Sequence, residues 1–116
     1  MRAALIAAIA LIATPVVADS PVVEMVTASK QGGTWSFSVT VSHPDEGWDH
    51  YADGWEVAAP DGTQLGYRKL LHPHVNEQPF TRSLSGVEVP DALTSVIIRA
   101  HDSVHEWGEP VTFELK

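Results

Sequence analysis

All six histidines of this 116-residue chain fall in three short stretches, and imidazoles gathered in this way can bind a transition-metal ion. The three pairs are His43 and His50, His72 and His74, and His101 and His105. Carboxylates lie close to each pair in the sequence. The chain contains no cysteine, so thiolate ligands are excluded and a soft ion such as Cu(I) is disfavoured. Nitrogen donors with carboxylate support favour Zn²⁺ or Cu²⁺.

The spacing of the histidines suggests which of them share an ion. His72 and His74 flank Pro73, so their side chains leave an extended backbone on the same face. We predict three imidazole ligands and a fourth chosen from two others: His72, His74 and His101, then His105 or His50. Two carboxylates are predicted to orient the rings through their second nitrogen. These are Glu77 and Asp102.

The hydrophobic pattern predicts an all-β protein. Trp35, Phe37, Val39 and Val41 alternate with small polar residues, and a second alternation runs through 96–101. No segment keeps a helical stripe beyond two turns. About seven such segments separated by turn residues favour an immunoglobulin-like or fibronectin-like antiparallel β-sandwich, with Trp55 in its core.

Such a topology would bring the histidine stretches together. The predicted strand 65–72 and the predicted strand 96–101 both run antiparallel to the strand that contains Trp55. Their ends therefore lie beside the start of that strand and beside the loop 43–50. All three histidine pairs are expected at this pole of the sandwich, whereas the turns at the opposite pole contain no histidine.

The first residues of the chain are typical of a secretory signal peptide. Arg2 precedes an apolar run over 3–13, a proline at 15, and small residues before a cleavage point after Ala18. We predict a signal peptide over 1–18 and one β-sandwich domain over 19–116, located in the periplasm or secreted. The apolar run is shorter than the roughly 20 residues that cross a bilayer, so no membrane span is expected after cleavage.

Charge and motifs restrict the function. The formal net charge of −8 argues against nucleic acid and anionic lipid, both of which need clustered Lys and Arg. The expected partners are a metal ion or an envelope protein. The sequence has neither a nucleophile-elbow pattern nor a glycine-rich phosphate loop. A binding protein is therefore favoured over an enzyme, and no catalytic residue is assigned.

A reading without metal explains the same residues. Imidazoles at the bases of loops often hydrogen-bond to backbone carbonyls and pack against tryptophans, and Trp48 and Trp107 lie beside these loops in the sequence. The loops would then form the recognition surface of an envelope accessory module. The direction of the rings distinguishes the two hypotheses, because ligands of one ion must converge.

Three sequence strings, WDHYADGWEV, LLHPHVNEQPFTRSL and IIRAHDSVHEWGEP, resemble a family of small exported bacterial proteins of uncharacterised function. The resemblance extends over nearly the whole of residues 19–116. It implies an exported β-sandwich, and it implies no particular chemistry.

Overall fold

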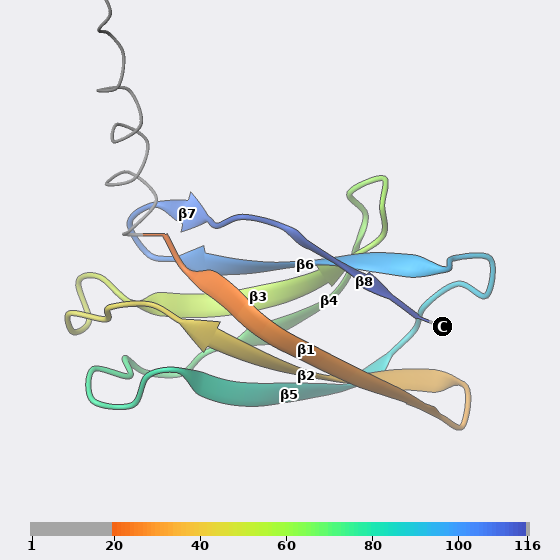
Figure 1. Cartoon of the computed structure of the whole chain (residues 1–116), viewed down its shortest axis with the longest axis horizontal. Helices are drawn as coiled ribbons and strands as arrows, with labels where there is room; N and C mark the ends of the chain where they lie inside the picture. Colours follow the sequence, from red (N-terminus) through yellow and green to blue (C-terminus); the bar gives the residue numbers. More distant parts are fainter. Residues whose placement is uncertain (1–19, 116) are drawn as a thin grey trace, which may run out of the picture.

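Eight strands form the domain, which a computed structural model describes over residues 20–115 (Figure 1). In chain order they are β1 (Val22–Gln31), β2 (Thr34–Ser42), β3 (Ala52–Ala58), β4 (Gln64–Lys69), β5 (Phe80–Val87), β6 (Ser95–Asp102), β7 (Glu106–Trp107) and β8 (Val111–Glu114). The predicted signal peptide, 1–18, lies outside the described residues. Residues 20–115 contain no helix that is long and apolar enough to cross a membrane.

The strands form two antiparallel sheets. One has the order β1-β2-β5, and the other has the order β4-β3-β6, with both β7 and β8 pairing to β6. The predicted antiparallel β-sandwich is confirmed, with eight strands in place of about seven. The extra strand arises because the last strand is divided: β7 pairs with the end of β6 and β8 with its start. Pro110, which cannot donate a ladder hydrogen bond, lies in the break.

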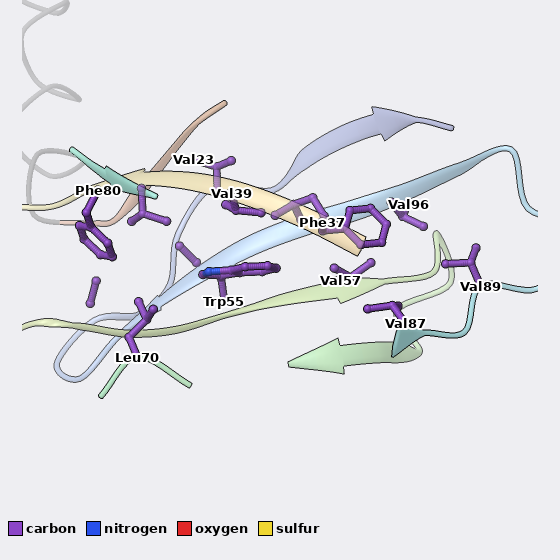
Figure 2. Close-up of a cluster of buried hydrophobic side chains, with 14 residues drawn as sticks. Val23, Phe37, Val39, Trp55, Val57, Leu70, Phe80, Val87, Val89 and Val96 are labelled. Carbon is purple, nitrogen blue, oxygen red and sulfur yellow. The ribbon is translucent and has the colours of Figure 1, made fainter. Parts of the chain in front are cut away.

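Apolar side chains from both sheets fill the space between the layers. Trp55 of β3 is fully buried there, as predicted, and its ring lies at the centre of the cluster in Figure 2. Phe37 and Val39 of β2 face it from the other sheet. Burying aromatic and branched side chains in this way supplies the main stabilising term for a domain without disulfides.

The alternation of inward and outward side chains along β2 and β6 extends to polar residues at the ends of these strands. On β2 the inward residues are Phe37, Val39 and Val41, and the next residue of the same parity is the buried His43. On β6 the inward residues end at Asp102, which is fully buried. Two polar residues therefore extend the inner face of the sandwich at one end of the core.

Three loops meet at that end of the molecule, on the left of Figure 1. We call residues 43–51, 70–79 and 103–105 the histidine pole. The predicted convergence of these loops is present, because hydrogen bonds join them directly. The Ser103 backbone N–H donates to the Tyr51 carbonyl over 3.0 Å, and the His74 backbone N–H donates to Asp45 over 2.7 Å.

Candidate metal centre

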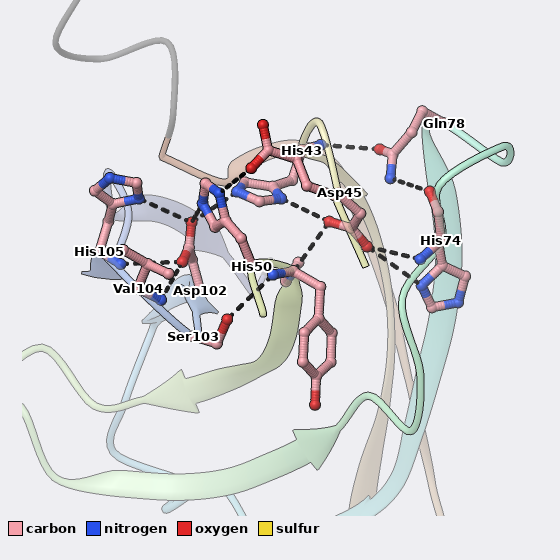
Figure 3. A network of polar contacts seen from close by, with 12 residues as sticks. His43, Asp45, His50, His74, Gln78, Asp102, Ser103, Val104 and His105 are labelled. Carbon is pink, nitrogen blue, oxygen red and sulfur yellow. Dashed lines mark hydrogen bonds and ion pairs between the residues drawn. The ribbon is translucent and has the colours of Figure 1, made fainter. Parts of the chain in front are cut away.

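Asp102 is the centre of the polar network at the histidine pole (Figure 3). Its Oδ2 lies 2.7 Å from His43 Nε2, 2.9 Å from His50 Nε2 and 3.2 Å from His105 Nδ1. Its Oδ1 accepts the backbone N–H groups of His105 and Val104. Three imidazole nitrogens thus point at one oxygen of a side chain that water does not reach.

The Asp102 carboxyl is ionised despite its position. Burial alone would raise the pKa of Asp102, but the hydrogen bonds from the backbone of His105 and Val104, and from the imidazoles, outweigh burial. They hold the pKa well below its usual range. The network therefore contains a fixed negative charge, which attracts either imidazole N–H groups or a cation.

His43 lies between two buried carboxylates. Its Nε2 faces Asp102, and its Nδ1 lies 2.6 Å from Asp45 Oδ1, while all three side chains are shielded from solvent. Asp45 also accepts the backbone N–H groups of Ala52 and His74. It therefore fixes the orientation of the His43 ring and joins the loop after β2 to the loop after β4.

His50 reaches the same oxygen from a tight turn. Gly47, with a φ of 108°, allows the chain to reverse, and the backbone N–H of Glu46 donates to the His50 carbonyl over 2.8 Å. His50 Nδ1 lies 3.0 Å from Glu46 Oε1. That hydrogen bond raises the pKa of His50 above 6.5, and the bond to Asp102 adds to the rise against the opposing effect of burial.

His105 comes from the hairpin between β6 and β7. The loop has three residues and is followed by Glu106 with a φ of 67°, which is a common geometry for short hairpins. A glutamate in this left-handed conformation costs about 1 kcal/mol, which tertiary contacts must offset. This hairpin places the His105 ring beside the His50 ring, with the two ring centroids 4.9 Å apart.

His43, His50 and Asp102 have the geometry of a cation site. One ligand atom from each of the three lies within 4.8 Å of the others. Zinc binds imidazole nitrogen at about 2.0–2.1 Å and also takes carboxylate oxygen, so both residue types are among its usual ligands. His43 and His50 also turn their second nitrogen to a carboxylate, Asp45 and Glu46 respectively, which is how proteins orient metal-binding imidazoles.

Two of the predicted ligands, His72 and His74, lie at the other side of the pole. Their rings are 4.6 Å apart, but His74 stacks on Phe80 and its Nε2 lies 3.1 Å from the guanidinium of Arg82. Burial and the Arg82 charge lower the pKa of His74. Its Nε2 therefore accepts a hydrogen bond from the Arg82 cation.

Glu77, which was predicted to orient histidine rings, pairs with Arg82. It is exposed, and its carboxylate lies 3.5 Å from the Arg82 guanidinium. Metal binding by His72 and His74 stays a prediction. Within residues 20–115 they are not part of the group of three that could hold an ion.

His101 was predicted as a metal ligand and Asp102 as a carboxylate that orients the rings, but their side chains lie on opposite faces of β6 and only Asp102 points inward. Adjacent residues of a strand point to opposite faces, and the inward face of β6 belongs to Asp102. His101 faces outward, where its Nδ1 lies 2.6 Å from Asp53 Oδ1 and its ring meets the edge of Trp107. Asp102 is accordingly a candidate ligand instead of an orienting carboxylate.

His43 was not among the ligands predicted from the sequence, and Asp45 was not singled out. The sequence signal for His43 was its spacing. It follows Phe37, Val39 and Val41 at intervals of two residues, so it lies on the same inward face as they do. The same argument from Val96, Ile98 and Ala100 leads to Asp102. No local pattern marks Asp45, whose role depends on contacts with residues far along the chain.

The fold and the site together define an antiparallel β-sandwich with a buried histidine and aspartate cluster at one pole. A protein from Halomicrobium mukohataei, named "Putative lipoprotein", is 44% identical over 90 residues, which are 78% of this chain and 44% of that protein. The chain thus spans less than half the length of this relative. No family model matches the sequence.

A solved structure shares the fold. The crystal structure of a hypothetical protein from Pyrococcus horikoshii OT3 is similar with a TM-score of 0.52, over 82% of this chain and 88% of that chain, at 13% identity. At this level of identity the likeness supports the β-sandwich and gives no information on the chemistry of the site.

Proposed function

We propose that this chain is an exported protein that binds a divalent transition-metal ion, Zn²⁺ or Cu²⁺, at the histidine pole. The ligands are His43, His50 and Asp102, with His105 as the fourth. The single observation that carries the proposal is the convergence of three imidazole nitrogens on Oδ2 of Asp102. Three nitrogens and one carboxylate oxygen suit both ions.

Two of the proposed ligands are prepared for binding before the ion arrives. Asp45 and Glu46 hold the rings of His43 and His50 by Nδ1, so that Nε2 of each faces the common point. A carboxylate at the outer nitrogen fixes the ring and makes the inner nitrogen a better donor. Little rotational freedom remains to be lost when the ion binds.

An envelope location is part of the proposal. The relative from Halomicrobium mukohataei is named a lipoprotein, which agrees with the signal-like features of residues 1–18 in this sequence. The protein would then bind its ion outside the cytoplasm, for trafficking, sensing or stabilisation of the fold.

A second function, as an envelope accessory module without metal, is supported by a specific observation. Both ring nitrogens of His43, and both of His50, already face carboxylate oxygens. Hydrogen bonds alone can therefore account for their orientation. The two candidates differ in one measurable respect, because the module without metal has the same melting temperature with Zn²⁺, Cu²⁺ or a chelator.

Replacing Glu46 by glutamine is expected to weaken Zn²⁺ binding by about tenfold to a hundredfold. The amide cannot match the carboxylate at Nδ1 of His50, so the ring loses orientation and donor strength. Titration calorimetry measures the affinity. Asp49→Asn on the same loop is the matched control, because it also removes one exposed acidic charge. Equal weakening by both substitutions would indicate a general charge effect and count against the proposed orientation.

Zinc affinity is expected to fall as the pH falls. Because Glu46 and Asp102 raise the pKa of His50 above its usual value, a proton competes with the ion for this ring more strongly than for an ordinary imidazole. Affinity should be greatest above that pKa and then decline through it, by about tenfold per pH unit for each proton displaced. Titrations at about pH 8, 7 and 6 test this. A constant affinity over that range would contradict His50 as a ligand.

A further inference from the structure

Exposed apolar side chains are concentrated in the three loops of the histidine pole. The described residues include seven large hydrophobic side chains that are well exposed, and four of them belong to the histidine pole: Trp48, Leu71, Val75 and Val104. Trp48 and Leu71 are 67% and 69% exposed. The turns at the opposite pole contribute none of the seven. Apolar side chains gathered on one exposed surface are typical of a binding site for another molecule.

All three loops of the pole contribute to this surface. Trp48 lies between β2 and β3, Leu71 and Val75 lie between β4 and β5, and Val104 lies between β6 and β7. Hydrogen bonds through Asp45, Gln78 and Tyr51 join the loops to one another. The surface therefore has a fixed frame, which reduces the entropy lost on docking.

Apart from its histidines, the same surface has only negatively charged side chains. The segments 43–51, 70–79 and 103–105 contain no Lys or Arg. They present three exposed carboxylates, Glu46, Asp49 and Glu77, and Glu106 follows directly. The nearest cations along the chain are Lys69 in β4 and Arg82 in β5, and Arg82 pairs with Glu77. An apolar surface with acidic groups around it complements a partner that carries both apolar and basic side chains.

Trp48 adds a second reason for a basic partner. Its ring stands edge-to-face against Tyr51, with centroids 5.5 Å apart, and remains mostly open to solvent. The face of an exposed indole attracts Lys and Arg side chains, and tryptophan is among the residues that contribute most to protein interfaces.

We infer that the histidine pole is the docking surface for a basic protein segment with apolar anchors. The surface belongs to the same loops as the proposed metal centre, yet docking does not require the metal. A second copy of this chain is a poor occupant, because the three loops of neither pole contain a Lys or Arg that could pair with the carboxylates of the other. A membrane with anionic lipids would be repelled for the same reason.

The test uses two synthetic peptides of equal length and amphipathic pattern, one of Lys and Leu and one of Glu and Leu. Fluorescence anisotropy of the labelled peptides measures binding to the purified protein. The Lys and Leu peptide should bind with an affinity that falls with added salt, whereas the Glu and Leu peptide should not bind. The double variant Trp48→Ser with Leu71→Ser should weaken binding at least tenfold.

Met25→Ser with Tyr67→Ser is the matched control, because it removes one exposed aliphatic and one exposed aromatic side chain from β1 and β4, outside the three loops. It should leave the affinity unchanged. Equal losses in the two double variants, or equal binding of both peptides, would overturn the inference. So would binding to phosphatidylcholine vesicles in place of the peptide. Zinc binding is measured in the same variants, so a failure of docking is separable from a failure of the metal proposal.

Discussion

Zn²⁺ at about a hundredfold excess over its dissociation constant should raise the free energy of unfolding by about 2.7 kcal/mol. The ion binds the folded chain, where distant residues converge, and has no comparable site in the unfolded chain. For a domain of this size the melting temperature should increase by on the order of 10–20 °C. Differential scanning calorimetry with zinc and with a chelator measures the difference.

Substitutions in two pairs of histidines locate the ion: His43 and His50 are the proposed ligands, and His72 and His74 are the comparison. His50→Ala should reduce the stabilisation by zinc, and His43→Ala with His50→Ala should remove it. His50 alone is the safer variant, since its side chain is 14% exposed whereas that of His43 is fully buried. His72→Ala with His74→Ala should keep the stabilisation. If that double variant loses it while His50→Ala keeps it, the site is at the pair originally predicted from the sequence.

Asp102→Ala should lower the free energy of unfolding by about 3–5 kcal/mol even in the presence of a chelator. The substitution leaves the imidazoles of His43 and His50, and the backbone N–H groups of Val104 and His105, without their acceptor. Natural domains of this size are stable by roughly 5–15 kcal/mol, so the loss is a large fraction of the total. Urea denaturation measures it.

Asp53→Ala is the matched comparison, because Asp53 is also an aspartate paired with a histidine on β6, 2.6 Å from His101. That pair is partly exposed to solvent, and its removal should cost about 1 kcal/mol or less. If Asp102→Ala does not fold, Asp102→Asn keeps an acceptor oxygen and tests the loss of charge alone. Equal costs at the two aspartates would refute the central role of Asp102.

The pH dependence of stability should reflect the same carboxylate. Because the folded pKa of Asp102 is lower than its ordinary value of 3.8, its ionised form stabilises the fold above that value. The contribution is lost as the pH falls below 3.8 toward the folded pKa. His74 acts in the same direction at higher pH, since its lowered pKa means that protonation below 6.5 opposes folding.

Much of the fold could be predicted from local patterns. Alternation in 35–41 and 96–101 correctly predicted two strands, and Trp55 occupies the core as expected. The predicted order of strands also brought the three histidine loops to one pole. These features follow from period-two burial and from antiparallel pairing, both of which are visible in a single sequence.

The pattern of histidines in the sequence was not sufficient to predict which residues form the candidate site. His-x-His spacing favoured His72 and His74, but the Arg82 guanidinium and the Phe80 ring occupy their surroundings. Arg82 comes from the next strand, and nothing in the sequence states that its head group reaches His74. Conversely, parity alone would have identified His43 and Asp102, had it been applied beyond the last apolar residue of each strand.

By itself the sequence determined the class of fold, the core position of Trp55 and the pole at which the histidines gather. Those properties depend on residue type and on spacing along one segment. Only the tertiary structure decided which imidazoles face a common point, because Asp45 and Asp102 join loops that are tens of residues apart in the sequence. Burial of a carboxylate, and the hydrogen bonds that keep it ionised, arise only when those loops meet.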